Sequence, residues 1–435
     1  MVCVSAEAVE SVGAGIRRLR TARGLTQRDL AQPEYSRALL AAVEAGIRSP
    51  TDDLLRHVAR RLDVELDDLR FARPPGAAAE LDAALREARQ ALGRGEADAA
   101  EAVFERVRRD ATRYALPDLA TWAGYLVGEA RLQRGELTAA MAAFDDLAGL
   151  LPAAGPAPRA AVLARRAYCQ FAGGDAAGAV ASIEAALTAE RRRADGDPDA
   201  QLRLSSALMY AYLELDWRDR ARQVEAQAQP LLARHTNREW LAQFLTIAGQ
   251  LRRGEDELAE AERMFTEAGR LYEELGLTRE VGLCRWAHGY VLRRVGRLDG
   301  AAEAFGAACS VLDRVGAAQD LAGAALELAE VRRRQGDLAE AARLAREAAE
   351  VCARSQHLEC MAEADRLLGL VAAARSEDGA EALLTRAADR YARIGLMAEV
   401  MATCRALGEL QLSRGATSDA AASFRRGLEA ARVLR

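Results

Sequence analysis

The side chains best suited to bind a charged partner are arginines near the N-terminus. Residues 12–61 hold ten Arg and five Asp or Glu, an excess of five positive charges, although the whole chain has a net charge of −5. An Arg guanidinium neutralises phosphates and forms paired hydrogen bonds with the edge of a guanine. This segment therefore favours nucleic-acid binding, which the charge of the whole chain does not.

Short capped helices around a tight turn are predicted to position these arginines. Thr26 can cap a helix that starts at Gln27, and Ser36 can cap a second helix after a short turn. Gly46 lies where a left-handed helix stop is expected, and Pro50 is predicted to occupy the first position of the next helix. This pattern predicts two helices across a turn, within a five-helix domain over residues 12–70.

The composition argues against catalytic and metal chemistry. All 60 basic residues are Arg, which excludes a phosphate-loop lysine and a Schiff-base lysine. The seven Cys are scattered without a CxxC pair and the four His are isolated, so we expect buried free thiols and no disulfide framework, metal site or cofactor. No catalytic constellation is recognised, and we expect no enzyme. The absence of a signal-like N-terminus and of an 18-residue apolar run predicts a cytoplasmic protein with no membrane partner.

Beyond residue 77 the sequence repeats. A turn residue is followed by Ala five positions later and, in most copies, by a bulky apolar residue nine positions later. The nine turn residues are Gly95, Gly135, Gly174, Asp216, Asp256, Gly296, Gly336, Arg375 and Gly415, at a mean spacing of 40 residues. This period predicts nine helical hairpins that bury their apolar faces by stacking. The small Ala would let the two helices approach closely, and the bulky residue is expected to fill the space between neighbouring hairpins.

The sequence therefore predicts an all-α protein of two domains. We expect a flexible lead-in over residues 1–11, a helix-turn-helix domain over 12–70, a linker over 71–77 and a helical solenoid over 78–435. The linker is assigned because Pro74, Pro75 and Gly76 interrupt the helical pattern.

Residues 12–70 resemble the Xre/Cro/C1-type helix-turn-helix family of DNA-binding domains. The matching marks are Arg20, Thr26, Gln27, Leu30, Ala31, Leu40, Val43, Glu44, Gly46 and Pro50. The resemblance implies that Arg20 and Glu44 form a structural pair inside the domain. It also implies that Gln27, Ser36 and Arg48 contact phosphates.

The same resemblance places Arg37 and Ala38 at the start of the recognition helix, where base edges are read. Ala41 and Ala42 on that helix leave few side chains that can hydrogen-bond to bases. For the three remaining arginines of the candidate surface, phosphate contact and plain solvation are equally open. These are Arg17, Arg18 and Arg23.

Residues 78–435 resemble tetratricopeptide repeats, because a small residue recurs seven positions before the turn at Gly128, Gly249, Gly289 and Gly408. The resemblance implies a right-handed α-solenoid whose first helices line a concave groove. The groove positions hold Trp122, Tyr125, Glu129, Tyr168, Arg203, Tyr210, Gln243, Gln250, Trp286, Tyr290, Arg293 and Arg294, and further on Arg333 and Arg405. Aromatic pockets with amide and guanidinium donors suit an extended peptide and its carboxylate, although each aromatic residue can equally serve in packing. Asn237 is a candidate ligand clamp, but a capping box with Thr236 as the cap is favoured.

The two domains together resemble the cytoplasmic peptide-pheromone receptors of Gram-positive bacteria. This resemblance implies a transcriptional regulator that binds a pseudo-palindromic operator in double-stranded DNA as a homodimer. A peptide or other small ligand would reposition the paired helix-turn-helix domains. The rival hypothesis is a protein-interaction adaptor with a degenerate helix-turn-helix domain, and the Arg excess favours the regulator.

Overall fold

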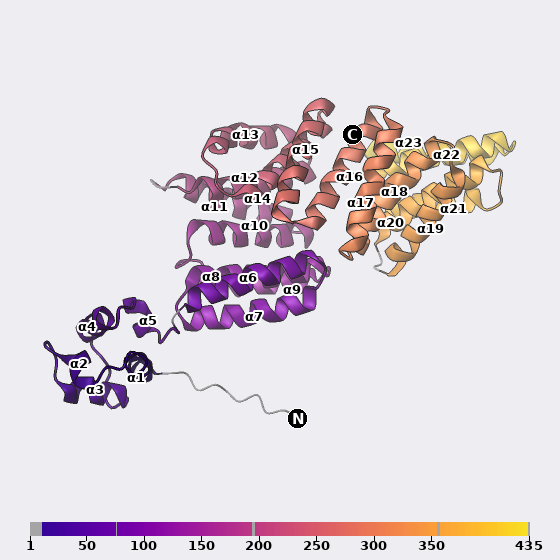
Figure 1. The fold of residues 1–435 in the computed structure, drawn as a ribbon. Coiled ribbons are helices and arrows are strands. Elements are labelled where there is room, and N and C mark those ends of the chain that lie inside the picture. Colours follow the sequence, from indigo (N-terminus) through magenta and orange to yellow (C-terminus); the bar gives the residue numbers. More distant parts are fainter. Residues whose placement is uncertain (1–10, 75, 194–195, 355–356, 434–435) are drawn as a thin grey trace, which may run out of the picture. The chain divides into compact units, whose positions relative to one another are not determined.

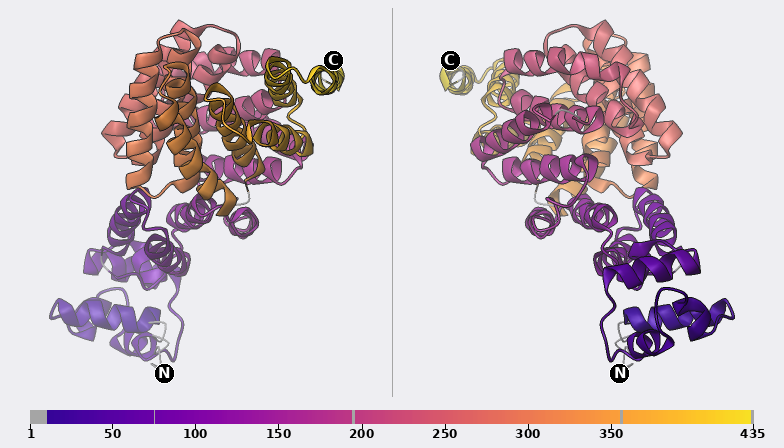
Figure 2. Two further views of the ribbon diagram at one scale, coloured as in Figure 1. Left: turned by 90° about the vertical axis from the view of Figure 1, so that its right-hand side faces the viewer. Right: turned by 90° about the vertical axis from the view of Figure 1, so that its left-hand side faces the viewer.

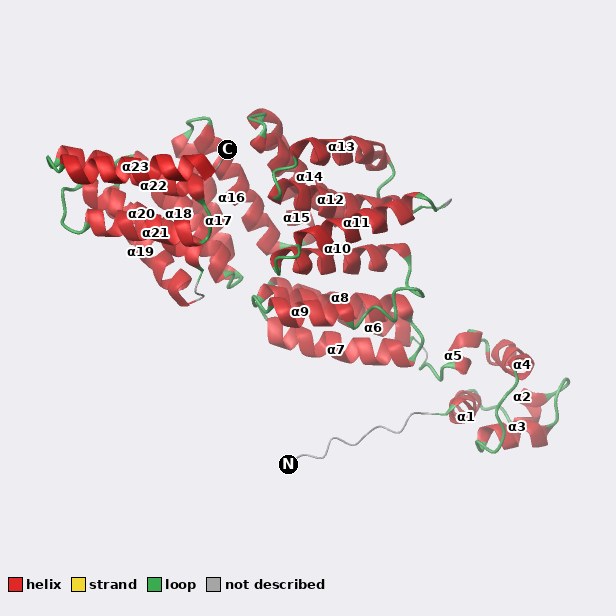
Figure 3. Ribbon diagram, turned by 180° about the vertical axis from the view of Figure 1, so that it is seen from behind, coloured by secondary structure: helices red, strands yellow, loops and turns green. Residues whose placement is uncertain are grey.

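A computed structural model describes residues 11–74, 76–193, 196–354 and 357–433. Within these ranges the chain folds into α-helices and one short 3-10 helix, joined by loops (Figure 1; Figure 3). This confirms the predicted all-α fold. The predicted lead-in lies outside the described residues except for Ser11, whose side chain caps the first helix. Over the same ranges, no helix combines the length and the hydropathy needed to cross a bilayer.

The helices fall into two compact units. The first contains Met1–Arg89 and Ala97–Val162, and the second contains Gln90–Glu96 and Leu163–Arg435. The first unit includes the helix-turn-helix domain, and the second includes most of the repeats. Figure 2 shows that successive helices of the second unit follow a curved path.

The helix-turn-helix domain consists of α1 (Val12–Ala22), α2 (Gln27–Ala31), α3 (Arg37–Glu44), α4 (Asp52–Leu62) and α5 (Leu66–Arg70). Both predicted caps are present. Thr26 forms a capping box with Asp29 at the start of α2. Ser36 Oγ accepts a hydrogen bond of 3.2 Å from the Leu39 N–H at the start of α3. Gly46 has φ +71°, as predicted for the stop after α3.

The prediction for Pro50 is wrong, because Pro50 lies before the helix instead of in its first turn. Thr51 is the cap of α4, and its hydroxyl accepts a hydrogen bond of 3.3 Å from the Leu54 N–H. A hydroxyl that satisfies a free helix amide stabilises this start better than a proline one residue earlier can. The five helices enclose one apolar core, whose least exposed members are Ile16, Leu30, Ala31, Leu40, Val58 and Leu62.

Nine consecutive helix pairs follow in the described part of the chain. They are α6 (Ala77–Gly93) with α7 (Ala97–Arg113), α8 (Pro117–Gln133) with α9 (Leu137–Asp145), α10 (Pro156–Ala172) with α11 (Ala176–Arg191), α12 (Pro198–Glu214) with α13 (Arg218–Ala228), α14 (Arg238–Gly254) with α15 (Leu258–Leu275), α16 (Thr278–Arg294) with α17 (Leu298–Arg314), α18 (Ala318–Arg334) with α19 (Leu338–Arg354), α20 (Leu358–Ala374) with α21 (Ala380–Arg393), and α22 (Met397–Ser413) with α23 (Thr417–Val433). The 3-10 helix, Gln229–Ala233, extends α13. The predicted hairpin repeat is confirmed.

Each hairpin turn contains a residue in the left-handed conformation. Six of these residues are Gly, with φ between 78° and 95°, and Asp216 and Asp256 have φ of 56° and 64°. In the eighth hairpin the left-handed residue is Ser376 (φ 55°) and not Arg375, which ends α20 with φ −92°. The prediction was therefore one residue early at this turn. Side chains with a Cβ adopt this conformation at a cost that Gly avoids.

The two helices of a hairpin meet where a glycine of the first faces a phenylalanine of the second. The pairs are Gly128 with Phe144, Gly249 with Phe265, Gly289 with Phe305 and Gly408 with Phe424. A Cβ added to Gly289 would lie 2.8 Å from the Phe305 ring, which is fully buried. Phe305 also joins a core cluster with Ala329 of the next hairpin. Phe305 therefore packs inside its own hairpin as well as between neighbouring hairpins. The sequence predicted only the second of these roles.

Cys352 and Cys360 form a disulfide, contrary to the expectation of free thiols. Cys352 lies in the last turn of α19 and Cys360 in the first turn of α20, so the connection between these helices brings their Cα atoms to 5.8 Å. This separation suits a disulfide. Sequence reasoning looked for CxxC spacing and missed the pairing of two cysteines across a repeat boundary. The free thiols of Cys169, Cys284 and Cys404 are buried, as expected.

The Gly289→Ala variant is expected to lower the free energy of unfolding by about 1–3 kcal/mol, because the added methyl group collides with Phe305. Gly306→Ala in α17 is the matched control, since a Cβ there meets no atom within 4 Å. The control should be neutral or stabilising by up to about 1 kcal/mol. Thermal unfolding followed by circular dichroism separates the two, and equal midpoints would contradict the packing role of the glycine.

Candidate nucleic-acid interface and ligand groove

The predicted Arg20–Glu44 pair holds α1 against the end of α3. Arg20 Nε donates to Glu44 Oε1 at 2.7 Å, and Arg20 Nη2 donates to Glu44 Oε2 at 3.0 Å. Arg20 Nη1 also donates to the carbonyl of Leu25 at 2.7 Å, in the loop that leads to α2. One guanidinium therefore ties three parts of the domain together.

Gln27 belongs to the same cluster. Its Nε2 donates to Glu44 Oε2 at 2.9 Å, so the side chain predicted to contact a phosphate is bonded within the domain in this structure. Burial opposes ionisation of Glu44, but hydrogen bonds from Arg20 and Gln27 outweigh it and hold the pKa of the Glu44 carboxyl below its usual value. The cluster fixes the positions of α1, α2 and α3 relative to one another.

The predicted DNA-contacting residues around α3 are exposed. Ser36, Arg37 and Ala38 lie at its start, and Arg48 lies beyond its end, next to Ile47, whose exposed fraction is 81%. The side chains of Arg37 and Arg48 make no hydrogen bond or ion pair with any described residue. Their charges are therefore available to an anionic partner.

The other residues of the predicted DNA-binding surface are less available for contact with DNA. Ala41 and Ala42 are half-buried, so the recognition helix offers few groups to a base edge, as expected. Arg17 is exposed and has no ion pair with a described residue, whereas Arg18 has an interaction partner within the chain. Arg23 lines a separate hollow of the domain.

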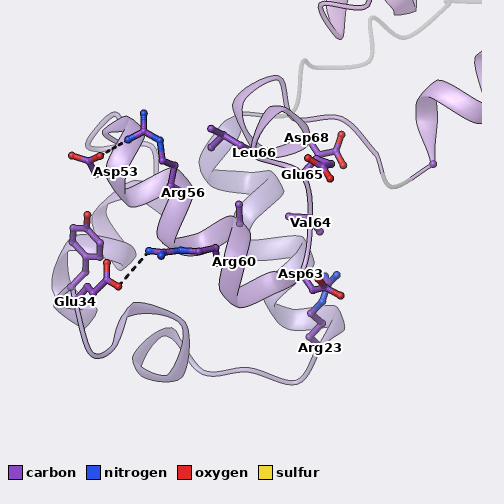
Figure 4. A pocket seen from close by; sticks show the side chains of 13 residues that line it. Arg23, Glu34, Asp53, Arg56, Arg60, Asp63, Val64, Glu65, Leu66 and Asp68 are labelled. Carbon is purple, nitrogen blue, oxygen red and sulfur yellow. Dashed lines mark hydrogen bonds and ion pairs between the residues drawn. The ribbon is translucent and has the colours of Figure 1, made fainter.

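The arginines of this hollow are outnumbered by acidic residues, and two of them form ion pairs within it (Figure 4). Arg56 pairs with Asp53 at 2.6 Å, and Arg60 lies 3.5 Å from Glu34. Asp63, Glu65 and Asp68 add further acidic groups to the lining. The hollow therefore does not favour DNA, in contrast to the surface that carries Arg37 and Arg48.

In the second unit, the first helices of four hairpins surround a cavity of about 330 Å³. The lining comes mainly from α10, α12, α14 and α16, and the charged and aromatic members are Arg165, Tyr168, Phe171, Arg203, Tyr210, Tyr272, Arg279 and Glu280. This volume is in the range of small-ligand sites. Its charged side chains are three Arg and one Glu, and guanidinium N–H groups are donors for carboxylate and carbonyl oxygens.

Aromatic rings form one wall of the cavity. The centroids of Tyr168 and Tyr210 are 5.9 Å apart, and Phe171 lies 6.3 Å from Tyr210. The Arg165 guanidinium lies 5.8 Å from the centroid of the Tyr168 ring. Burial, with smaller contributions from Glu214 and Tyr168, raises the pKa of the Tyr210 hydroxyl, which therefore stays protonated and can donate a hydrogen bond.

Polar groups also line the cavity. Gln243 Oε1 is buried and has no hydrogen-bond partner. A buried acceptor without a partner costs stability unless a ligand or water supplies a donor. Arg279 is paired with Asp320 at 2.7 Å, and burial raises the pKa of the adjacent Glu280.

Four of the predicted groove residues are brought together here, namely Tyr168, Arg203, Tyr210 and Gln243. The others do not line this cavity: Trp122, Tyr125 and Glu129 are on α8 in the first unit, Gln250 is on α14, and Trp286, Tyr290, Arg293 and Arg294 are on α16. Sequence reasoning missed Arg165, Phe171, Thr246, Arg279 and Glu280. Arg165 and Phe171 lie three positions before and after Tyr168, so helical spacing on the predicted face could have identified them.

Some predicted groove aromatics have packing roles instead. Tyr125 is 6% exposed and lies 6.1 Å from the Phe144 ring. Trp286 occupies the space that a Cβ on Gly323 would need, 2.4 Å away. Asn237, and not Thr236, is the cap of α14, since its Oδ1 accepts hydrogen bonds of 3.1 Å from the Glu239 and Trp240 N–H groups. The packing alternative therefore applies to part of the predicted set.

Comparison with known protein families identifies the N-terminal domain. Residues 16–69 match the family described as Helix-turn-helix (HTH_3), so the N-terminal part is a DNA-binding type of domain. No curated protein sequence matches the chain. The described residues contain no group of three or more His, Cys, Asp or Glu arranged to hold a metal ion.

The fold is similar to those of several solved structures. They include a Rap protein complexed with competence and sporulation factor (TM-score 0.56, 14% identity, 82% of this chain and 99% of that one). Another is the apo form of the quorum sensor NprR from B. thuringiensis (TM-score 0.52, 13% identity, 81% of this chain and 99% of that one). A third is aspartyl phosphate phosphatase F from Bacillus subtilis (TM-score 0.52, 11% identity, 80% of this chain and 93% of that one). At these identities the likeness shows the fold alone, a stack of helical hairpins.

The Glu44→Ala variant should destabilise the helix-turn-helix domain by about 3–5 kcal/mol, since it leaves the Arg20 guanidinium without its carboxylate. The pKa of Glu44 is lowered on folding, so its contribution is complete above the ordinary value of 4.5 and is lost as the pH falls through the lowered value. The difference between wild type and variant should therefore shrink in acid. Hydrogen–deuterium exchange of residues 12–70 measures it.

Asp53→Ala is the control for that experiment. The Asp53 side chain is 79% exposed, so its removal should change the domain's stability by less than about 0.5 kcal/mol. Equal exchange in the two variants would show that the Arg20–Glu44 pair contributes nothing to the domain.

Proposed function

We propose that this protein is a DNA-binding transcriptional regulator whose solenoid senses a peptide or other small ligand. In this proposal the ligand occupies the cavity between α10, α12, α14 and α16 and repositions the paired helix-turn-helix domains of a homodimer. The observation that carries the proposal is the combination, in one chain, of unpaired arginines beside α3 and an aromatic, cationic cavity in the solenoid.

The DNA part of the proposal is supported by charge and geometry. Arg37 begins α3, the second helix of the motif, which in this class of domain enters the major groove. Because Ala38, Ala41 and Ala42 offer no polar groups, a single copy has few base contacts. Affinity would therefore depend on phosphate contacts and on two copies that bind half-sites about 34 Å, or a multiple of that distance, apart.

The ligand part is supported by the cavity and by the proteins that share the fold. One of those structures is named as a quorum sensor, and another is bound to competence and sporulation factor. A ligand that moves a two-state equilibrium from 1:99 to 99:1 must prefer one state by about 5.5 kcal/mol. In a curved stack of hairpins, small rotations at each interface add up along the solenoid and can carry such a change to its ends.

Arg37→Ala and Arg48→Ala should each weaken binding of the full-length protein to DNA from upstream of its own gene. Loss of a phosphate contact lowers the slope of log affinity against log salt by about 0.9. Loss of a base contact costs about 1–3 kcal/mol and reduces discrimination between sequences. Fluorescence anisotropy at several salt concentrations distinguishes the two.

Arg56→Ala is the matched control, because Arg56 is already paired with Asp53. It should bind DNA like the wild type. If wild-type protein shows no salt-sensitive binding to this DNA, with or without cell extract, the regulator proposal is wrong.

Tyr210→Ala should abolish the effect of cell extract on DNA binding while leaving DNA binding without extract unchanged, because Tyr210 supplies a ring and a hydroxyl to the cavity. Trp217→Ala removes an aromatic side chain that is 43% exposed and outside the cavity, and it should respond to extract like the wild type. A Tyr210→Ala protein that still responds fully would place the ligand elsewhere.

A further inference from the structure

Arg253 is an arginine of the solenoid that lacks an acidic partner. It lies in the last turn of α14, and its side chain makes no hydrogen bond or ion pair with any described residue. Its neighbour Arg252 is different, since both oxygens of Glu225 accept hydrogen bonds of 2.9 Å from Arg252 Nη2.

The Arg253 guanidinium lies over an aromatic ring. It is 4.6 Å from the centroid of the Tyr290 ring, and the Arg293 guanidinium lies 4.9 Å from the same centroid. Stacking on a ring occupies the face of a guanidinium and leaves its N–H groups at the edge for a planar acceptor.

The carboxylates around Tyr290 are fewer than the arginines. Arg293 Nη2 pairs with Glu327 at 3.0 Å, and the exposed Arg294 pairs with Asp256 at 2.9 Å. Arg293 Nε is buried and has no hydrogen-bond partner. Burial lowers the pKa of the Arg253 guanidinium, against the opposing effects of Tyr290 and Glu327, as expected for a cation that is removed from water without full compensation.

We propose that Arg253, Tyr290 and Arg293 form a binding subsite for a carboxylate of the ligand. A carboxylate is the planar, bidentate partner that guanidinium edges bind best. The proposal rests on the ligand-sensing function above and names the group by which the ligand would be held outside the aromatic cavity.

The position of this subsite also limits the length of the ligand. Gln243, whose buried Oε1 needs a donor, and Arg253 are ten residues apart on α14. Ten helical residues span about 15 Å. An extended peptide covers that distance with about five residues. A peptide that donates a backbone N–H to Gln243 therefore reaches Arg253 with a C-terminal carboxylate about five residues on.

The test uses acetylated pentapeptides with an aromatic first residue, each made both as the free acid and as the C-terminal amide. Peptides retained by the full-length protein are identified by mass spectrometry. Free acids should be enriched about tenfold or more over their amides, as expected for a charge-assisted pair. Arg253→Gln should remove this enrichment, and Arg253→Lys should retain part of it.

Arg285→Gln is the matched control. Arg285 lies on α16, the helix that carries Tyr290 and Arg293, but it is paired with Glu273 at 2.8 Å. It should enrich free acids like the wild type. Circular dichroism verifies that the Arg253 variants are folded. If Arg253→Gln does not fold, the reduced enrichment expected for Arg253→Lys still tests the subsite.

The outcomes separate the subsite from the proposed function. Equal retention of acids and amides, or unchanged enrichment in Arg253→Gln, overturns the subsite while peptide sensing stands. Retention of neither form overturns the subsite together with peptide sensing, and DNA binding is then judged by its own measurement. Preferential retention of peptides with acidic side chains as amides would overturn the assignment to the C-terminal carboxylate.

Discussion

The contact between a glycine of one helix and a phenylalanine of the next sets the spacing on which the solenoid depends. Gly249 faces Phe265 and Gly289 faces Phe305, in each case without room for a Cβ. Helices that approach this closely bury the ring completely, and the hairpins can then stack on one another. The cavity requires this stacking, because its lining comes from the first helices of four consecutive hairpins.

Ion pairs determine which arginines of the helix-turn-helix domain remain available. Arg20 is bound to Glu44, Arg56 to Asp53 and Arg60 to Glu34, so the acidic residues of the domain neutralise arginines away from the start of α3. The side chains of Arg37 and Arg48 have no ion-pair partner among the described residues. A modest excess of charge in the sequence is thus concentrated by folding on the surface beside the recognition helix.

The sequence predicted the fold well because its signals are local and repeated: a turn residue, a small residue and a cap recur at fixed spacing. The structure confirms the hairpins. It corrects the position of single residues, such as the left-handed residue of the eighth turn, which is Ser376 and not Arg375. The cavity was predicted in part. Counting along one helix identifies Tyr168 and Tyr210, but which hairpins converge depends on small rotations summed over the stack. No local pattern encodes that sum, and Arg279 was missed for this reason. The Cys352–Cys360 bond was missed because the prediction considered only CxxC spacing.

Helix α14 shows how such a protein can acquire a new specificity. Ala248 and Gly249 face the packed interior, while Gln243 and Thr246 face the cavity. The residues that hold the solenoid together and those available for recognition are therefore interleaved on one helix but do not overlap. Substitutions on the second set leave the glycine–phenylalanine contacts intact. Chains with this architecture can diverge in the molecules they recognise while their scaffold stays under unchanged selection for stability.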